Sequence, residues 1–271
     1  MLNTPEAAVR DFISLQYRAG NSKHIEVLCP YSDLLKIFER IQQQWTSIGD
    51  REPYASVLSE SKYRMDSINA NIDEFHESGR SGMANLKQLS LKNDIYLPNG
   101  TLFELGCGVG RSTQHFAPAF ESISAWDISK GNLAECTKIL TQRGVRNVTL
   151  NHVTDFAQYK IIPKHDVFFS EIVIQHNPPP VQYYLIDKIF QTLNPGGIFY
   201  FQTITHHETY SFRVSDYLSW QHNQDFEMHA LPMRWVLRLI QKNNLVLLDV
   251  LKERMGGFNL DSHTFFGIRP A

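Results

Sequence analysis

The chain has 271 residues, of which 42% are hydrophobic and 12% aromatic, so it can form a sizeable core and is not disordered by composition. A formal net charge of −2 gives no electrostatic reason to expect nucleic acid or an anionic membrane surface as a partner. No segment approaches the roughly 18 apolar residues of a membrane span.

The three cysteines are an odd number and have no C-x-x-C spacing. This pattern fits neither a disulfide framework nor a zinc site. The first residues also lack the basic and apolar regions of a signal peptide. We therefore expect a cytoplasmic protein without a bound metal.

The first third of the chain is polar and has helical periodicity. Apolar residues recur at three-to-four spacing, which predicts amphipathic helices. These helices are expected over 7–17, 33–45 and 72–89, the last interrupted at Gly79 and Gly82. Residues 49–53 are expected to form a loop. Turn residues at 97–100 end this region, so we predict a helical N-terminal cap over 1–97 and a core domain over 98–271.

In the core domain, short apolar runs alternate with helical patterns, which indicates a parallel sheet built from crossover units. The first five predicted strands span 101–105, 122–126, 147–152, 165–169 and 197–202. The helices between them span 112–117, 131–143 and 181–193, the last ended by the turn residues 194–197. An insertion over 203–228, a helix over 231–242 and two strands over 245–251 and 263–268 complete the chain.

The most specific motif follows the first predicted strand and reads E-L-G-C-G-V-G over residues 104–110. Glycine permits a positive φ and a close approach of ligand to backbone. A strand that runs into such a turn and then a helix is the first crossover of a nucleotide-binding α/β fold. The dinucleotide fingerprint needs a glycine at its sixth position, where this chain has Arg111. The spacing therefore argues against NAD and FAD.

This E-x-G-x-G-x-G pattern, with Glu104 in the acidic position, resembles motif I of the class I S-adenosylmethionine (SAM)-dependent methyltransferases. Further motifs follow in the order of that family, over roughly residues 100–203. One of them, S-E-I-V-I-Q-H-N-P over 170–178, resembles the S-x-x-V-L-Q-H-I-P segment of bacterial sugar, glycan and small-metabolite methyltransferases, although Asn177 replaces an apolar residue. The resemblance implies SAM as cofactor. It also implies a seven-stranded, mostly parallel, doubly wound Rossmann-like α/β sheet with a helical N-terminal cap and a closing antiparallel hairpin.

Two aspartates are candidate contacts for the cofactor. Asp127 ends the second predicted strand, about 20 positions after the glycine turn, where an acidic residue commonly binds the ribose hydroxyls; a helix N-cap is the alternative role. The resemblance implies that Asp155 accepts from the adenine amino group while Phe156 packs on the ring, although Asp155 could be an ordinary loop residue. The predicted cofactor-binding residues are Glu104, Gly106, Cys107, Gly108, Gly110, Asp127, Ile128, Asp155, Phe156, Ser170 and Glu171.

His176 follows the fourth predicted strand, at the sheet edge where ligands bind in such folds. Because an imidazole can accept a proton at neutral pH, we predict His176 as the catalytic base and His206 as a second catalytic candidate. A purely structural role for His176 remains the alternative. Loops after strands often carry specificity, so the insertion is expected to face the substrate. The predicted substrate-binding residues are His207, Tyr210, Arg213 and Trp220.

The expected reaction is transfer of a methyl group from SAM to a hydroxyl of a small-molecule or sugar/glycan acceptor by direct displacement. An amine acceptor is an alternative. Two further classes stay open, a catalytically inactive cofactor-binding subunit and a nucleotide-dependent oxidoreductase, and the glycine spacing counts against the second.

Overall fold

The computed structural model describes residues 24–220, 226–253 and 260–271. Within them, one seven-stranded sheet has the order β3-β2-β1-β4-β5-β7-β6. The strands are β1 (Thr101–Leu105), β2 (Ser122–Asp127), β3 (Val148–His152), β4 (His165–Ser170), β5 (Leu193–His207), β6 (Val246–Glu253) and β7 (Leu260–Ile268). The first five strands run parallel, and β7 is antiparallel to β5 and β6. The predicted doubly wound, mostly parallel sheet is confirmed.

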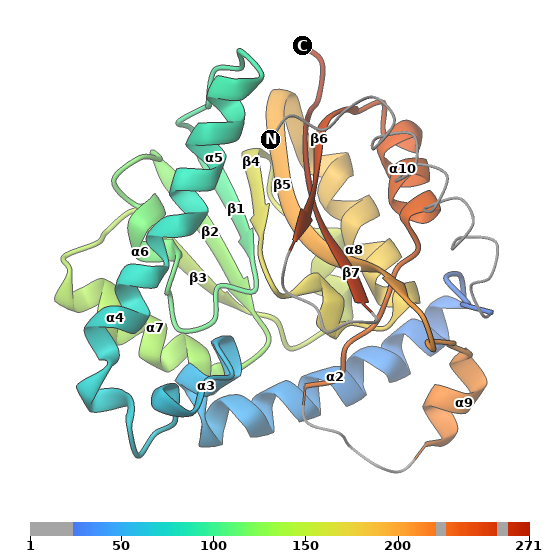
Figure 1. Cartoon of the computed structure of the whole chain (residues 1–271), viewed down its shortest axis with the longest axis horizontal. Coiled ribbons are helices and arrows are strands. Elements are labelled where there is room, and N and C mark those ends of the chain that lie inside the picture. The colour runs from blue at the N-terminus through green and yellow to red at the C-terminus, as the bar shows by residue number, and fades with distance from the viewer. Residues whose placement is uncertain (1–23, 221–225, 254–259) are drawn as a thin grey trace, which may run out of the picture.

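Helices precede the sheet and connect its strands (Figure 1). The helices are α2 (Tyr31–Arg51), α3 (Pro53–Val57), α4 (Ile72–Ser78), α5 (Arg80–Lys92), α6 (Thr113–Phe116), α7 (Lys130–Gln142), α8 (Pro179–Thr192), α9 (Val214–Ser219) and α10 (Met233–Lys242). Short 3₁₀ turns add η1 (Ser61–Tyr63), η2 (Ile68–Ala70), η3 (Phe156–Lys160) and η4 (Ile174–His176). The helix predicted over 7–17 lies outside the described residues. None of the described helices is both long and apolar enough to cross a membrane.

Both faces of the sheet are buried, because side chains alternate along each strand. On β4, Phe168 joins a cluster with residues of α2, α8 and α10, whereas its neighbours Val167 and Phe169 join a second cluster with residues of α5 and α6. On β5, Phe199 joins the first cluster and its neighbour Tyr200 joins the second. Helices therefore cover both faces, as a doubly wound fold requires.

Helix α2 lies across one end of the sheet, between α3 and α9 (Figure 1). Several of its buried side chains, among them Phe38 and Ile41, belong to the same hydrophobic cluster as Trp126 of β2. The N-terminal helices therefore cover the sheet edge at which β1, β2 and β4 end. A domain boundary near residue 98 remains a prediction.

The loop predicted over 49–53 is wrong, because α2 continues to Arg51 and α3 begins at Pro53. The reason is a close approach between helices. A Cβ added to Gly49 would lie 2.0 Å from the Oγ of Ser129, just before α7. Gly49 is thus a contact point inside a helix, and packing overrides its low helix propensity.

Candidate active site

A cavity of about 760 Å³, open to solvent, lies where β1, β2 and β4 end. The strand order reverses here, since β1 lies between β2 and β4, and ligands of open α/β sheets bind at such a point. Helices α2 and α3 supply part of its wall. The lining residues are Ile41, Trp45, Ser56, Val57, Leu105, Gly106, Gly108, Arg111, Trp126, Asp127, Ile128, Asn132, Tyr159, Glu171, Ile172, Val173, His176, Asn177 and Leu185.

The glycine turn after β1 forms one wall of this cavity. Gly106, Gly108 and Gly110 have φ values of 76°, 54° and 78°, in the left-handed region that other residues avoid. A Cβ on Gly108 would also lie 2.7 Å from a methyl of Val57, and one on Gly106 would lie 2.3 Å from a methyl of Val173. The turn therefore needs glycine for its backbone shape and for the close contact of its neighbours.

Asp127 connects this turn to the end of β2. One carboxylate oxygen accepts from the N–H of Gly108 at 2.8 Å, and the other accepts from the N–H of Ser129 at 2.8 Å. Burial raises the pKa of Asp127, and these backbone donors oppose the rise. A carboxylate has about four lone-pair sites, so both oxygens keep capacity for the hydroxyls of a ligand.

A smaller cavity of about 310 Å³ continues behind the glycine turn and is bordered by Glu104, Cys107, Arg111 and Glu171. The buried carboxylate of Glu104 accepts a 2.7 Å hydrogen bond from the hydroxyl of Thr113, and burial raises its pKa to about 7. The guanidinium of Arg111 lies 3.3 Å from the carboxylate of Glu171. This end of the site can therefore offer both acid and cationic groups to a zwitterionic ligand.

Cys107 lies inside the glycine turn and borders the smaller cavity. Its hydrogen bond with Cys136 and its burial raise the pKa of the Cys107 thiol well above the usual value. The nucleophilic form of cysteine is the thiolate. Cys107 is therefore a small buried filler of the turn.

His176 lies on the cavity wall and packs edge-on against Trp45, with ring centroids 4.9 Å apart. Its Nδ1 is 2.9 Å from the main-chain carbonyl oxygen of Glu227. Because a carbonyl only accepts, Nδ1 must carry the proton, and Nε2 keeps its lone pair. Burial lowers the pKa of His176 to about 4, so the ring is neutral at physiological pH. Among the described residues, none hydrogen-bonds Nε2.

The backbone is strained beside this histidine. Ile172 has φ 58°, which is unusual for a β-branched residue, and it lines the cavity. Its N–H donates to the side-chain oxygen of Gln202 at 2.9 Å. Such conformations cost about 1–3 kcal/mol and occur often at functional sites.

Four of the predicted cofactor residues line neither cavity. Asp155 is exposed and caps η3, accepting from the N–H of Ala157 at 2.8 Å, whereas Phe156 is buried in the core. The hydroxyl of Ser170 donates to the carbonyl of Leu105 at 3.0 Å. Gly110 packs against Cys136. Their roles toward a cofactor stay predictions.

The described residues of the insertion line neither cavity. His206 and His207 end β5, Arg213 is exposed before α9, and Trp220 is 44% exposed. The hydroxyl of Tyr210 instead meets the imidazole of His229 at 2.8 Å. A direct substrate contact by these residues stays a prediction.

Sequence reasoning missed the contribution of α2 and α3 to the cavity, above all Trp45, Ser56 and Val57. In the sequence, Trp45 is only the last residue of the amphipathic helix expected over 33–45. An amphipathic pattern shows that a helix has an apolar face, but it does not show that the end of α2 extends beyond the core and covers the sheet edge. The close glycine contacts between α2 and α7 produce that placement, and they are visible only in three dimensions.

Comparisons with known proteins agree with this geometry. A family model described as a methyltransferase domain matches residues 102–197. The structure is similar to magnesium protoporphyrin IX methyltransferase from Synechocystis PCC 6803 with bound S-adenosylhomocysteine (SAH), with 14% identity, a TM-score of 0.59 and coverage of 86% of this chain and 99% of that chain. It is also similar to the N-methyltransferase NodS from Bradyrhizobium japonicum WM9 in complex with SAH, with 15% identity, a TM-score of 0.53 and coverage of 81% and 100%.

A third similar structure is geranyl diphosphate C-methyltransferase from Streptomyces coelicolor A3(2), with 14% identity, a TM-score of 0.56 and coverage of 84% of this chain and 98% of that chain. A search of curated proteins found no match. At these identities the structural likeness shows the fold alone. The three neighbours methylate different kinds of acceptor by their names, so they leave the acceptor of this chain open.

The residues at the sheet edge fit a SAM molecule. A glycine turn with positive φ borders the cavity, the carboxylate of Asp127 keeps acceptor capacity beside it, and charged groups surround the smaller cavity behind. Together with the matching family model, this shows that the chain contains a class I SAM-dependent methyltransferase domain, whose cofactor is SAM.

Proposed function

We propose that this protein transfers the methyl group of SAM to a hydroxyl of a small-molecule acceptor, with His176 as the base. One observation carries this proposal: His176 lies on the cavity wall with Nδ1 engaged by a carbonyl and Nε2 without a partner among the described residues. A lone pair that reaches a ligand cavity can take a proton from an acceptor.

In this proposal the sheet edge holds the cofactor. Asp127 accepts the ribose hydroxyls, Ile128 contacts the nucleoside, and the turn at Gly106 and Gly108 supports the rest. Bound SAM supplies an electrophilic methyl carbon on its sulfonium sulfur. The residues therefore mainly have to align the acceptor and exclude water.

The remaining task of the protein is to move one proton. With SAM bound, the acceptor oxygen would bond to the methyl carbon as the carbon–sulfur bond breaks and SAH leaves. His176 would take the hydroxyl proton at Nε2, and the carbonyl of Glu227 would continue to accept from Nδ1 as the ring becomes charged. A carbonyl that faces Nδ1 stabilises this imidazolium. The lowered pKa keeps the ring ready as a base at neutral pH, but it also weakens the driving force for proton transfer.

That weaker driving force favours an acidic hydroxyl, such as a phenol with a pKa of about 10. The cavity wall supports the same choice. Trp45 presents an aromatic surface next to His176, and aromatic side chains pack well on planar rings. We therefore propose an aromatic acceptor in preference to a sugar.

An acceptor screen with radiolabelled SAM tests this proposal. Phenols, sugars and amines of similar size are incubated with the protein, and labelled products are identified by mass spectrometry. The proposal expects O-methylated phenols. Exclusive methylation of amines would refute the hydroxyl acceptor while leaving methyl transfer intact. Binding of SAH without labelling of any compound would favour a cofactor-binding subunit, and binding of NADH would favour the oxidoreductase alternative.

A further inference from the structure

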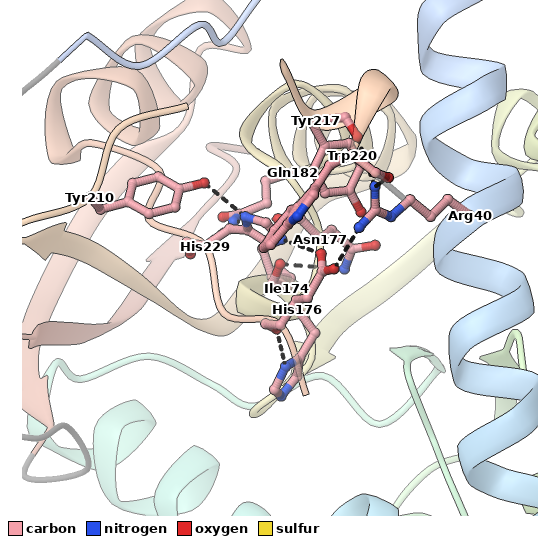
Figure 2. A network of polar contacts seen from close by, with 10 residues as sticks. Arg40, Ile174, His176, Asn177, Gln182, Tyr210, Tyr217, Trp220 and His229 are labelled. Carbon is pink, nitrogen blue, oxygen red and sulfur yellow. Dashed lines mark hydrogen bonds and ion pairs between the residues drawn. The ribbon is translucent and has the colours of Figure 1, made fainter. Parts of the chain in front are cut away.

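A buried polar network connects α2 to the loop that carries His176. Figure 2 shows Arg40 on α2 directed toward Tyr217 and Trp220, and Tyr210 directed toward His229. Arg40 donates to the carbonyls of Tyr217 and Trp220 at 2.7 Å and 2.9 Å. Its guanidinium also lies 4.2 Å from the centre of the Tyr217 ring. The proposed cofactor and proton-transfer roles use none of these groups.

Glu227 is the centre of this network. Its side chain is 6% exposed, and one carboxylate oxygen accepts from Arg40 at 3.1 Å. The other oxygen is 3.3 Å from Nε2 of His229. Burial would raise the pKa of Glu227, but the hydrogen bond from His229 and the charge of Arg40 outweigh it and lower that pKa. Glu227 is therefore a buried carboxylate with both oxygens in use.

The protons in this network have one consistent arrangement. A carboxylate only accepts, so Nε2 of His229 carries a proton, and its Nδ1 accepts from the hydroxyl of Tyr210 at 2.8 Å. Burial lowers the pKa of His229, so its ring is neutral. The main chain of His229 is fixed as well, since its N–H donates to the carbonyl of Gln175 at 2.8 Å and its carbonyl accepts from Gln182 at 3.1 Å.

The backbone of Glu227 makes the contact with the proposed base. Its carbonyl is the group that accepts from Nδ1 of His176. The side chain and the main chain of one residue thus join α2 to the imidazole. We propose that Glu227, paired with Arg40, is a positioning residue that holds its own carbonyl against His176 and so keeps the lone pair of Nε2 directed at the acceptor. This inference rests on the proposed role of His176.

The tautomer of His176 can be read without any acceptor, from the ¹⁵N chemical shifts of its two ring nitrogens in the full chain. We expect the wild type to hold the proton on Nδ1. In Glu227→Gln, the carboxamide cannot accept from both Arg40 and His229, so the segment should loosen and the shifts should move toward a mixture of tautomers. An unchanged Nδ1–H tautomer would overturn the positioning role.

The steady-state kinetic constants provide a second test. Glu227→Gln should lower kcat about tenfold while the KM for SAM stays within about twofold, and it should have no further effect in a His176→Ala background. Equal effects in both backgrounds would overturn the inference, because the loss would then not act through His176. Full activity of His176→Ala would instead refute the base while leaving the tautomer result to decide the positioning role.

Two further variants complete the experiment. Asp187→Asn is the matched control, because Asp187 is also a largely buried carboxylate in an ion pair, with Lys242 at 2.8 Å, and lies outside the site. It should change neither the His176 shifts nor kcat. If Glu227→Gln does not fold, Arg40→Lys decides by the same two readings, since lysine cannot bond the carboxylate and both carbonyls in the fork geometry of arginine.

Discussion

The carboxylate of Asp127 accepts the N–H of Gly108 across 2.8 Å, which links the end of β2 to the glycine turn that follows β1. The two chain segments that border the cavity are thereby fixed relative to each other before any ligand binds. The same carboxylate has acceptor capacity left for a diol. One residue thus shapes the turn and is available to a ligand.

Asp127→Asn should weaken SAH binding at least about tenfold, or roughly 1.4 kcal/mol. The amide nitrogen would face either Gly108 or Ser129, both of which are donors. Isothermal titration calorimetry measures the change. Asp166→Asn is the matched control, because Asp166 also accepts a backbone N–H at 2.8 Å, but from Thr101 at the opposite end of β1. Equal losses in the two variants would argue against a ligand contact by Asp127.

Gly108→Ala should lower the affinity for SAH by at least about tenfold. The alanine would be strained at φ 54°, and its Cβ would press on Val57 in the cavity wall. Gly144→Ala separates these two effects, since Gly144 also has a positive φ of 66° but has nothing within 4 Å of an added Cβ. It should lose stability without losing affinity. Unchanged affinity in natively folded Gly108→Ala would assign the glycine to the turn alone.

The pH dependence of turnover follows from the burial of His176. Because burial lowers its pKa to about 4 in the free protein, kcat/KM should stay level as the pH falls below 6.5 and should decline only as it approaches about 4. His165 provides the comparison, since burial lowers its pKa to about 4 as well, but it lies at the start of β4. A folded His165 variant should keep the acid limb. An acid limb centred near 6.5 would contradict the environment assigned to His176.

Glu104 should make the free energy of unfolding depend on pH. This stability should fall as the pH rises, whereas the turnover governed by His176 should fall as the pH drops. The folded pKa of Glu104, about 7, is raised above the ordinary value near 4.5, so its stabilising protonated form is fully present below about pH 4.5 and is lost as the pH rises through 7. Glu104→Gln cannot titrate. Its stability relative to the wild type should therefore increase by up to about 3 kcal/mol between pH 4.5 and 7. Urea unfolding curves measure this difference, and parallel pH profiles would contradict it.

The sequence predicted those parts of the fold that depend on local pattern. The first strand was predicted as 101–105 and spans Thr101–Leu105. By contrast, β5 was predicted over 197–202 but extends from Leu193 to His207. The extension toward His207 follows from pairing with β7, where His207 lies opposite Leu260. Because the partner strand follows more than fifty residues later in the chain, the local sequence pattern around His207 cannot indicate this pairing.

The same division applies to the site. The turn residues Gly106 and Gly108, together with Asp127 and His176, were predicted at this edge because each ends or follows a strand, and the structure places all four on the cavity wall. Trp45 could not be found, since its place depends on how α2 packs. The insertion is predicted to face the substrate, and its last described part contacts His176 through the carbonyl of Glu227.

The turnover of His176→Ala is the most direct measurement of the central proposal. It requires the hydroxyl acceptor identified by the screen, saturating SAM and a parallel titration with SAH. The account predicts a fall in kcat of about 10²- to 10⁴-fold with an unchanged Kd for SAH, because His176 moves a proton and Asp127 and the glycine turn hold the cofactor. Turnover within a factor of about two of the wild type would contradict it and show that alignment alone suffices.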